Sequence, residues 1–152
     1  MTMASFGSGL SVSAGLALAR AAEAMLRALG GCEVTLRFSG GASPDDAASN
    51  RRLGLGTSET EDVALSPVVV RYGNTSTSAS QTRGTGADDS FEFMIAGSAV
   101  DEQVELRQTG TAKALFESAL GFVNDGKLLR ITGVSADFHS GAAYLYRVTA
   151  RE

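Results

Sequence analysis

Residues 128–152, LLRITGVSADFHSGAAYLYRVTARE, decide the fold of this chain. Apolar residues recur at alternate positions in both halves of the stretch, and turn-forming residues at 137–141 separate the halves. A period of two is typical of half-buried antiparallel strands. The sequence therefore predicts a C-terminal β-hairpin with strands over 128–134 and 144–151.

Further strands are predicted upstream of this hairpin. They cover 33–38 (EVTLRF), 62–65 followed by 67–72 (PVVVRY), and 91–96 (FEFMIA). Proline cannot donate to a strand ladder, so Pro67 predicts either one broken strand or two strands. The segment 98–107 is ambiguous, because Val104 and Leu106 alternate with charged residues. Residues 39–52 are expected to form a loop or to contain a short helical turn.

The first predicted helix lies near the N-terminus. Ser11 or Ser13 can cap its first turn, and Gly30-Gly31 ends it, because glycine readily adopts the left-handed C-cap conformation. Helical spacing predicts one apolar face, made of Leu18, Ala22, Met25 and Leu29.

A second, short helix precedes the hairpin. Thr111 is the predicted N-cap, the helix extends through Leu120, and Gly121 ends it. The segment 124–126, Asn-Asp-Gly, is a turn signal that separates this helix from the C-terminal strands.

The order of these elements predicts the fold class. Strands that follow one another without regular βαβ alternation favour an α+β fold. We expect a small antiparallel β-barrel or sandwich with an N-terminal helix, a short helix between strands and a long flexible hairpin loop. Residues 1–10 are predicted to be a flexible arm, and residues 11–152 a single domain with an extended loop at 73–90.

The segment 73–87, GNTSTSASQTRGTGA, consists mostly of Gly, Ser and Thr. Such a composition cannot bury enough apolar surface to order itself, so the segment is expected to be mobile in the free protein. It joins two predicted strands, and long loops inside a small domain are commonly functional. We therefore expect it to become ordered when it docks to a partner.

Residues with catalytic chemistry are scarce. His139 is the single histidine and Cys32 the single cysteine, so a nucleophile–base pair and a zinc site are both disfavoured. We expect His139 to be an exposed turn residue and Cys32 a buried thiol. No phosphate-binding or dinucleotide-binding glycine motif is present. The sequence predicts a protein that is not an enzyme and has no cofactor and no metal.

The charge pattern argues against nucleic-acid recognition. The formal net charge is −4, and no basic patch is interleaved with aromatic residues. No stretch approaches the ~18 apolar residues of a membrane-spanning helix, and no signal peptide is recognisable at the N-terminus. The absence of a cysteine pair suits a reducing compartment.

Several segments resemble the head–tail connector proteins of tailed bacteriophages, which are also described as head-completion, neck or tail-attachment proteins. The resemblance covers residues 112–152, with the turn at 124–126 and the two closing strands, and extends to Leu65–Arg71 and Phe91–Val100. It implies a structural virion protein in the phage neck, made in the host bacterial cytoplasm. It also implies a homo-oligomeric ring between the portal or adaptor and the tail proteins.

The same resemblance implies a role for the long loop. Members of this family let DNA pass through a central channel without binding it specifically, and some use a long loop at that channel. The loop and the carboxylates next to it are therefore the candidate site: Gly73, Asn74, Thr75, Ser76, Gln81, Arg83, Asp88, Asp89 and Glu92. We expect the three carboxylates to repel phosphates over a screening length of roughly 8–10 Å.

Two other classes of function remain open. The chain could be a small β-barrel of bacterial origin that binds a small molecule or a peptide. It could also be an enzyme whose site is completed by a neighbouring subunit.

Overall fold

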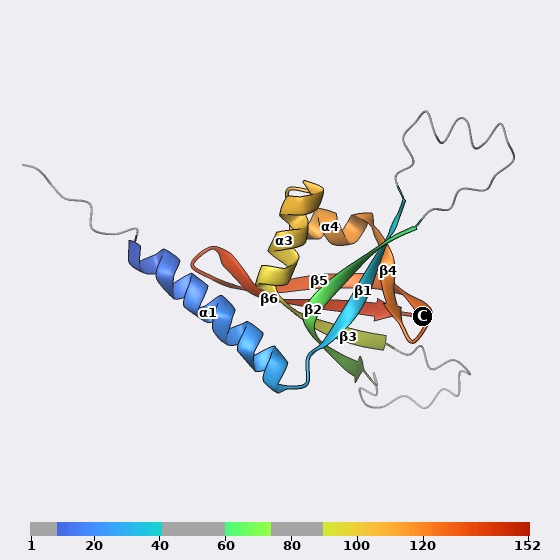
Figure 1. Ribbon diagram of the computed structural model, residues 1–152, viewed down its shortest axis with the longest axis horizontal. Helices are drawn as coiled ribbons and strands as arrows, with labels where there is room; N and C mark the ends of the chain where they lie inside the picture. The colour runs from blue at the N-terminus through green and yellow to red at the C-terminus, as the bar shows by residue number, and fades with distance from the viewer. Residues whose placement is uncertain (1–8, 41–59, 74–89) are drawn as a thin grey trace, which may run out of the picture.

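A computed structural model describes residues 9–40, 60–73 and 90–152, with side chains described from Ala14 onward in the first range. Within these residues six strands close into an antiparallel barrel in the order β1-β2-β3-β6-β5-β4 (Figure 1). The strands are β1 (Cys32–Ser39), β2 (Thr60–Gly73), β3 (Ser90–Ala96), β4 (Ala119–Asn124), β5 (Lys127–His139) and β6 (Ala142–Arg151). The helices are α1 (Gly9–Ala28), α3 (Gly97–Arg107) and α4 (Ala112–Ser118). The predicted α+β class with an antiparallel barrel is confirmed.

Alternation along the strands fills the barrel. Val34, Leu36 and Phe38 of β1 are buried, and so are the inward residues of β3 and β6. At the centre, the rings of Phe93 and Phe122 stack with centroids 4.2 Å apart. The sequence pattern that predicts each strand is therefore also what packs the core.

Strand β2 runs continuously through Pro67. Its first half pairs with β1 and its second half with β3, and the register with β1 shifts between Cys32 and Val34, opposite this point. A proline is tolerated at such an irregularity because no ladder hydrogen bond is needed from it. The sequence leaves open one broken strand or two separate strands, and the structure has a single strand.

The ambiguous segment 98–107 is helical. Val100 of α3 is fully buried, whereas Leu106 is exposed. At the end of the helix, the Arg107 guanidinium lies 3.7 Å from the centre of the Phe38 ring and pairs with Glu61 at 2.8 Å. Tertiary contacts of this kind decide between helix and strand where the local pattern does not.

Helix α4 begins as predicted and ends earlier. The Thr111 side chain accepts a hydrogen bond from the backbone N–H of Ala114 at 3.2 Å, which confirms the N-cap. The helix stops at Ser118, and the next residues form β4. The prediction that Gly121 ends the helix is wrong: it lies inside β4, where its lack of a side chain allows close approach to β5.

The contact face of α1 differs from the predicted one. Leu26 is fully buried against Met94, Ala96 and Leu145 on the outer wall of the barrel. Met25, which the sequence places on the apolar face, is 50% exposed, and Leu29 beyond the helix end is 56% exposed. Ala22 is buried as predicted, so the barrel wall covers only part of the predicted apolar face.

Gly15 of α1 offers a direct test of helix stability. A Cβ added at Gly15 would meet no atom within 4 Å. Alanine is favoured over glycine in a helix interior by roughly 0.8–1.0 kcal/mol. We expect Gly15→Ala to raise the free energy of unfolding by about that amount in urea denaturation, whereas a loss of stability would contradict a helical Gly15.

A groove beside the free edge of strand β5

Strand β5 is longer than its neighbour β4. Three residue pairs join these strands, from Phe122 opposite Leu129 to Asn124 opposite Lys127. The β5–β6 pairing then continues from Arg130 to His139. Within the described ranges no strand lies on the other side of this part of β5, so residues 130–139 form an open strand edge.

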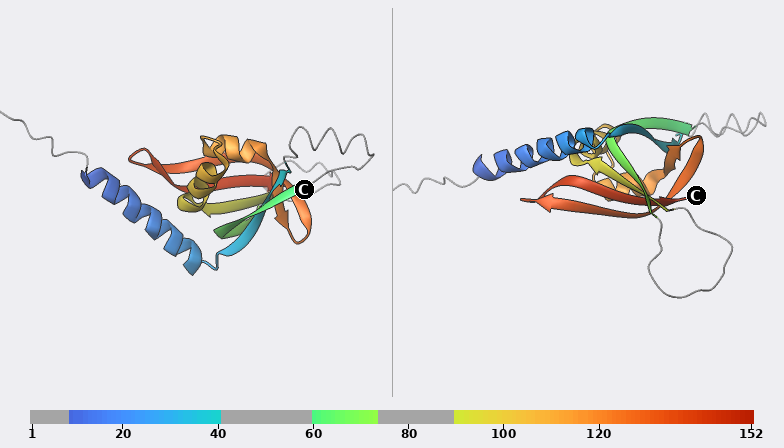
Figure 2. Two further views of the ribbon diagram at one scale, coloured as in Figure 1. Left: turned by 45° about the horizontal axis from the view of Figure 1, so that its top comes forward. Right: turned by 90° about the horizontal axis from the view of Figure 1, so that it is seen from below.

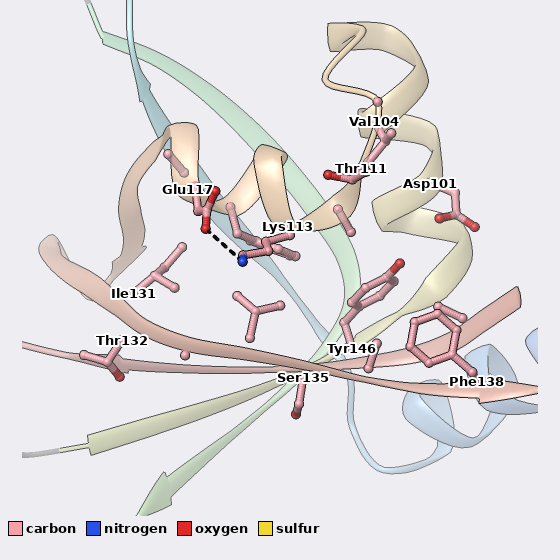
Figure 3. A pocket seen from close by; sticks show the side chains of 18 of the residues that line it. Asp101, Val104, Thr111, Lys113, Glu117, Ile131, Thr132, Ser135, Phe138 and Tyr146 are labelled. Atoms are coloured by element: carbon pink, nitrogen blue, oxygen red, sulfur yellow. Dashed lines mark ion pairs between the residues drawn. The ribbon is translucent and has the colours of Figure 1, made fainter. Parts of the chain in front are cut away.

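A groove of about 1210 Å³ lies along this edge (Figure 3). Its lining includes every residue of β5 from Arg130 to Ala136, whichever face the side chain occupies. Only a space against the strand edge touches inward-facing and outward-facing residues alike. The opposite wall is α4, with Lys113 and Glu117, and the end of the groove meets α3 at Asp101.

The floor of the groove is apolar. Ile131, Val134 and Ala136 of β5 line it together with Tyr146 of β6 and Phe116 of α4. Near the tip of the hairpin, Phe138 is 64% exposed. Large exposed apolar side chains gathered in one concavity are a mark of an interaction site.

Polar groups stand at the rim. Lys113 and Glu117 of α4 form an ion pair at 3.7 Å (Figure 3), which contributes little at such exposure. Burial, together with the nearby charge of Glu105, raises the pKa of the Asp101 carboxyl above its usual value. Burial likewise raises the pKa of the Tyr146 hydroxyl, with a smaller contribution from Asp101. None of the ion pairs among the described residues neutralises Asp101.

The groove shows no arrangement for covalent or metal chemistry in the described residues. No cluster of three metal-ligating side chains occurs among them. His139 is exposed, as predicted, but it is the last residue of β5 and not a turn residue, and it lies outside the groove lining. The prediction of a buried Cys32 is wrong: this residue is exposed at the start of β1, and its thiol donates to the Val68 carbonyl at 3.4 Å. Across the described ranges no helix combines the length and the apolar character needed to cross a membrane.

The groove does not include the residues predicted from the sequence. Gly73 ends β2, where its carbonyl accepts a hydrogen bond from the Ser90 hydroxyl at 2.7 Å. Glu92 lies in β3 between Arg71 and Thr149 of the neighbouring strands, on the face opposite the buried Phe91 and Phe93. The other predicted site residues lie outside the described residues: Asn74, Thr75, Ser76, Gln81, Arg83, Asp88 and Asp89.

One sequence signal points to the groove in hindsight. The segment before the turn at 124–126 is short, whereas the alternating segment after it is long. Two strands of unequal length joined by a tight turn leave part of the longer strand unpaired. The predicted helix through Leu120 obscures this signal, because it includes residues 119 and 120, which belong to β4.

Comparison with models of protein families gave no match, and neither curated proteins nor solved structures gave a significant match to this chain. The resemblance to phage head–tail connectors therefore stays a prediction from the sequence.

Proposed function

We propose that this chain is a ring-forming structural subunit that joins two larger assemblies, as the head–tail connectors of tailed phages do. The observation that carries the proposal is the uncovered face of α1. Five exposed alanines form a stripe along the helix: Ala14, Ala17, Ala21, Ala24 and Ala28. Their alternating spacing of three and four residues puts them on one side of the helix.

The alanine stripe is continuous with larger apolar groups. Exposed Met25 lies next to it on the helix, and exposed Leu29 follows the last turn. The charged residues Arg20, Glu23 and Arg27 lie away from its centre, and Arg27 pairs with Glu23 at 2.6 Å. An uncharged face on an otherwise charged protein favours contact with another apolar surface.

Helix α1 also extends outward beyond the barrel (Figures 1 and 2). Isolated helices shorter than about 12–15 residues are marginal in water, so the projecting part gains from a neighbour that packs on it. Small side chains let two helices approach closely. In the proposal, a neighbouring copy covers the alanine stripe, and head-to-tail repetition of the contact closes a ring.

A connector needs a second surface for the next protein in the assembly. Leu145 and Tyr146 are consecutive residues of β6 and point to opposite sides of it: Leu145 packs under α1, and Tyr146 lines the groove. The helix and the groove are therefore separate surfaces, available to different partners. This supports an adaptor in the phage neck, with the portal or adaptor on one side and tail proteins on the other.

The proposal places DNA in the centre of the ring. Asp88, Asp89 and Glu92 would form a negative wall along which DNA slides without specific binding. The net charge of −4 is consistent with such a passive channel.

The ring is tested by placing charges on the alanine stripe. In the variant Ala21→Glu with Ala24→Glu, two carboxylates would have to be desolvated in the interface, so assembly should weaken more than about tenfold. Multi-angle light scattering and negative-stain images should show rings for the natural chain and monomers for the variant, with equal circular dichroism. Arg20→Glu makes the same net change in charge at the border of the stripe, where the natural chain already carries a charged residue; it is the matched control and should still assemble. A natural chain that stays monomeric at high concentration would refute the ring.

The groove favours a second candidate function, a monomeric peptide-binding barrel. The same mass measurement separates the two, because that function requires no assembly.

A further inference from the structure

We infer that the open edge of β5 binds an extended segment of a partner protein as an added strand. The segment carries apolar side chains at alternate positions and a basic residue that faces Asp101. This inference names the chemistry of the partner at the second surface of the proposed connector, and it rests on that proposal only for the origin of the segment.

The backbone of β5 supplies the first argument. In an antiparallel ladder, alternate residues direct their N–H and C=O groups away from the paired neighbour. Along residues 130–139 the paired neighbour is β6, and no backbone hydrogen bond from the described residues reaches the other edge. Such an unpaired row is a template for another strand, and added strands are a recurring mode of peptide recognition.

The side chains of the groove supply the second argument. Val134, Ala136 and Phe138 present apolar surface at intervals of two residues, which matches the side-chain period of an extended segment. The volume of about 1210 Å³ exceeds the ~300–1,000 Å³ that is typical of small-molecule pockets. A helix would fill the space but leave the strand edge unpaired, because its own backbone groups are already bonded.

Charge supplies the third argument and fixes one position of the segment. Figure 3 shows Asp101 at the Phe138 end of the groove, away from Ile131 and Thr132. Asp101 and Glu105 are neighbours one helical turn apart, so two like charges meet there. A Lys or Arg in the bound segment would relieve this repulsion. The groove is therefore complementary to a segment with its cation near the tip of the β5–β6 hairpin.

The experiment uses synthetic decapeptides as probes. A library with apolar residues at alternate positions and Lys near either end is screened against the full chain, and binders are measured by fluorescence anisotropy. We expect binders whose amide-exchange footprint adds protection at alternate residues of β5 between 130 and 138 and none in β3.

N-methylation of the peptide backbone distinguishes strand addition from binding through apolar side-chain contacts alone. N-methylation of the peptide residues that face β5 should abolish binding, whereas methylation of the intervening residues should leave it within about threefold. Equal effects of the two patterns would overturn the inference. So would a library without binders, or concentration-dependent protection of β5 without peptide, which would assign the edge to a second copy of the chain.

Variants of the protein complete the test. Phe138→Ala should weaken binding about tenfold, and because this side chain is mostly exposed the fold should persist. Asp101→Asn should weaken binding of Lys peptides and leave unchanged the binding of peptides with norleucine at that place. Tyr72→Ala, which removes an exposed aromatic side chain of β2 outside the groove lining, is the matched control and should bind normally.

The test is independent of ring formation. Peptide binding should be equal in the natural chain and in the variant with Ala21→Glu and Ala24→Glu. If rings are absent but peptides bind, the connector proposal fails and the strand-addition inference stands. If rings form and no peptide binds, the connector proposal stands and the strand-addition inference fails.

Discussion

Replacing Phe122 by alanine is expected to lower the free energy of unfolding by about 3–5 kcal/mol, the usual cost of emptying a large buried site. Phe122 is fully buried and stacks on Phe93 with an interplanar angle of 19°. The Phe116 ring lies 6.3 Å from the Phe122 ring, so three aromatic side chains share this part of the core. Small domains are stable by only about 5–15 kcal/mol, so this single change would remove a large share.

Urea denaturation followed by circular dichroism measures this loss. Tyr72→Ala is the matched control, because Tyr72 is also aromatic but is 72% exposed, with its ring centre 5.1 Å from that of Phe91. Its substitution should cost less than about 1.5 kcal/mol. A similar cost for both variants would mean that the Phe93–Phe122 stack does not hold the barrel together.

The strands of this barrel could be predicted because their signal is local. A period of two along 33–38, 91–96 and 144–151 requires only the neighbours in sequence, and each of these segments is a strand. The N-cap at Thr111 and the turn at 124–126 are equally local, and both are observed. The α+β class follows from the order of such strands and helices, whereas the choice of a barrel over a sandwich depends on the pairing of β1 with β4, which closes the sheet.

Features that depend on distant residues could not be predicted. Helix α3 depends on Val100 entering the core and Arg107 reaching Phe38, contacts invisible in the local pattern. The burial of Leu26 in place of Met25 depends on where α1 crosses the barrel wall. The groove exists because β5 extends beyond the last residue of its pairing with β4. This depends on which residues of the two strands pair, and neither strand shows it alone.

Gly121 controls that pairing, and Gly121→Ala is expected to destabilise the fold by at least about 3 kcal/mol. Its φ is 152°, and a Cβ there would lie 2.2 Å from the Leu129 carbonyl oxygen. The Cβ is fixed to the backbone of β4 and the atom that it meets belongs to the backbone of β5, so the clash can be relieved only by moving β4 away from β5. These strands share only three residue pairs, so such a movement would break a large part of the hydrogen bonding between them.

Gly133→Ala in the neighbouring strand is the matched control for Gly121→Ala. A Cβ at Gly133 would meet only the Thr149 hydroxyl, at 2.9 Å, and a side-chain hydroxyl can rotate away. We expect thermal unfolding of Gly133→Ala within about 5 °C of the natural chain, and Gly121→Ala to be poorly soluble or at least about 12 °C less stable. Equal melting temperatures would show that β4 and β5 can separate without cost. Helix α4 leads directly into β4 and forms the groove wall opposite β5, so such freedom would also leave the width of the groove variable. An extended segment could then bind only if its own contacts drew α4 and β5 together.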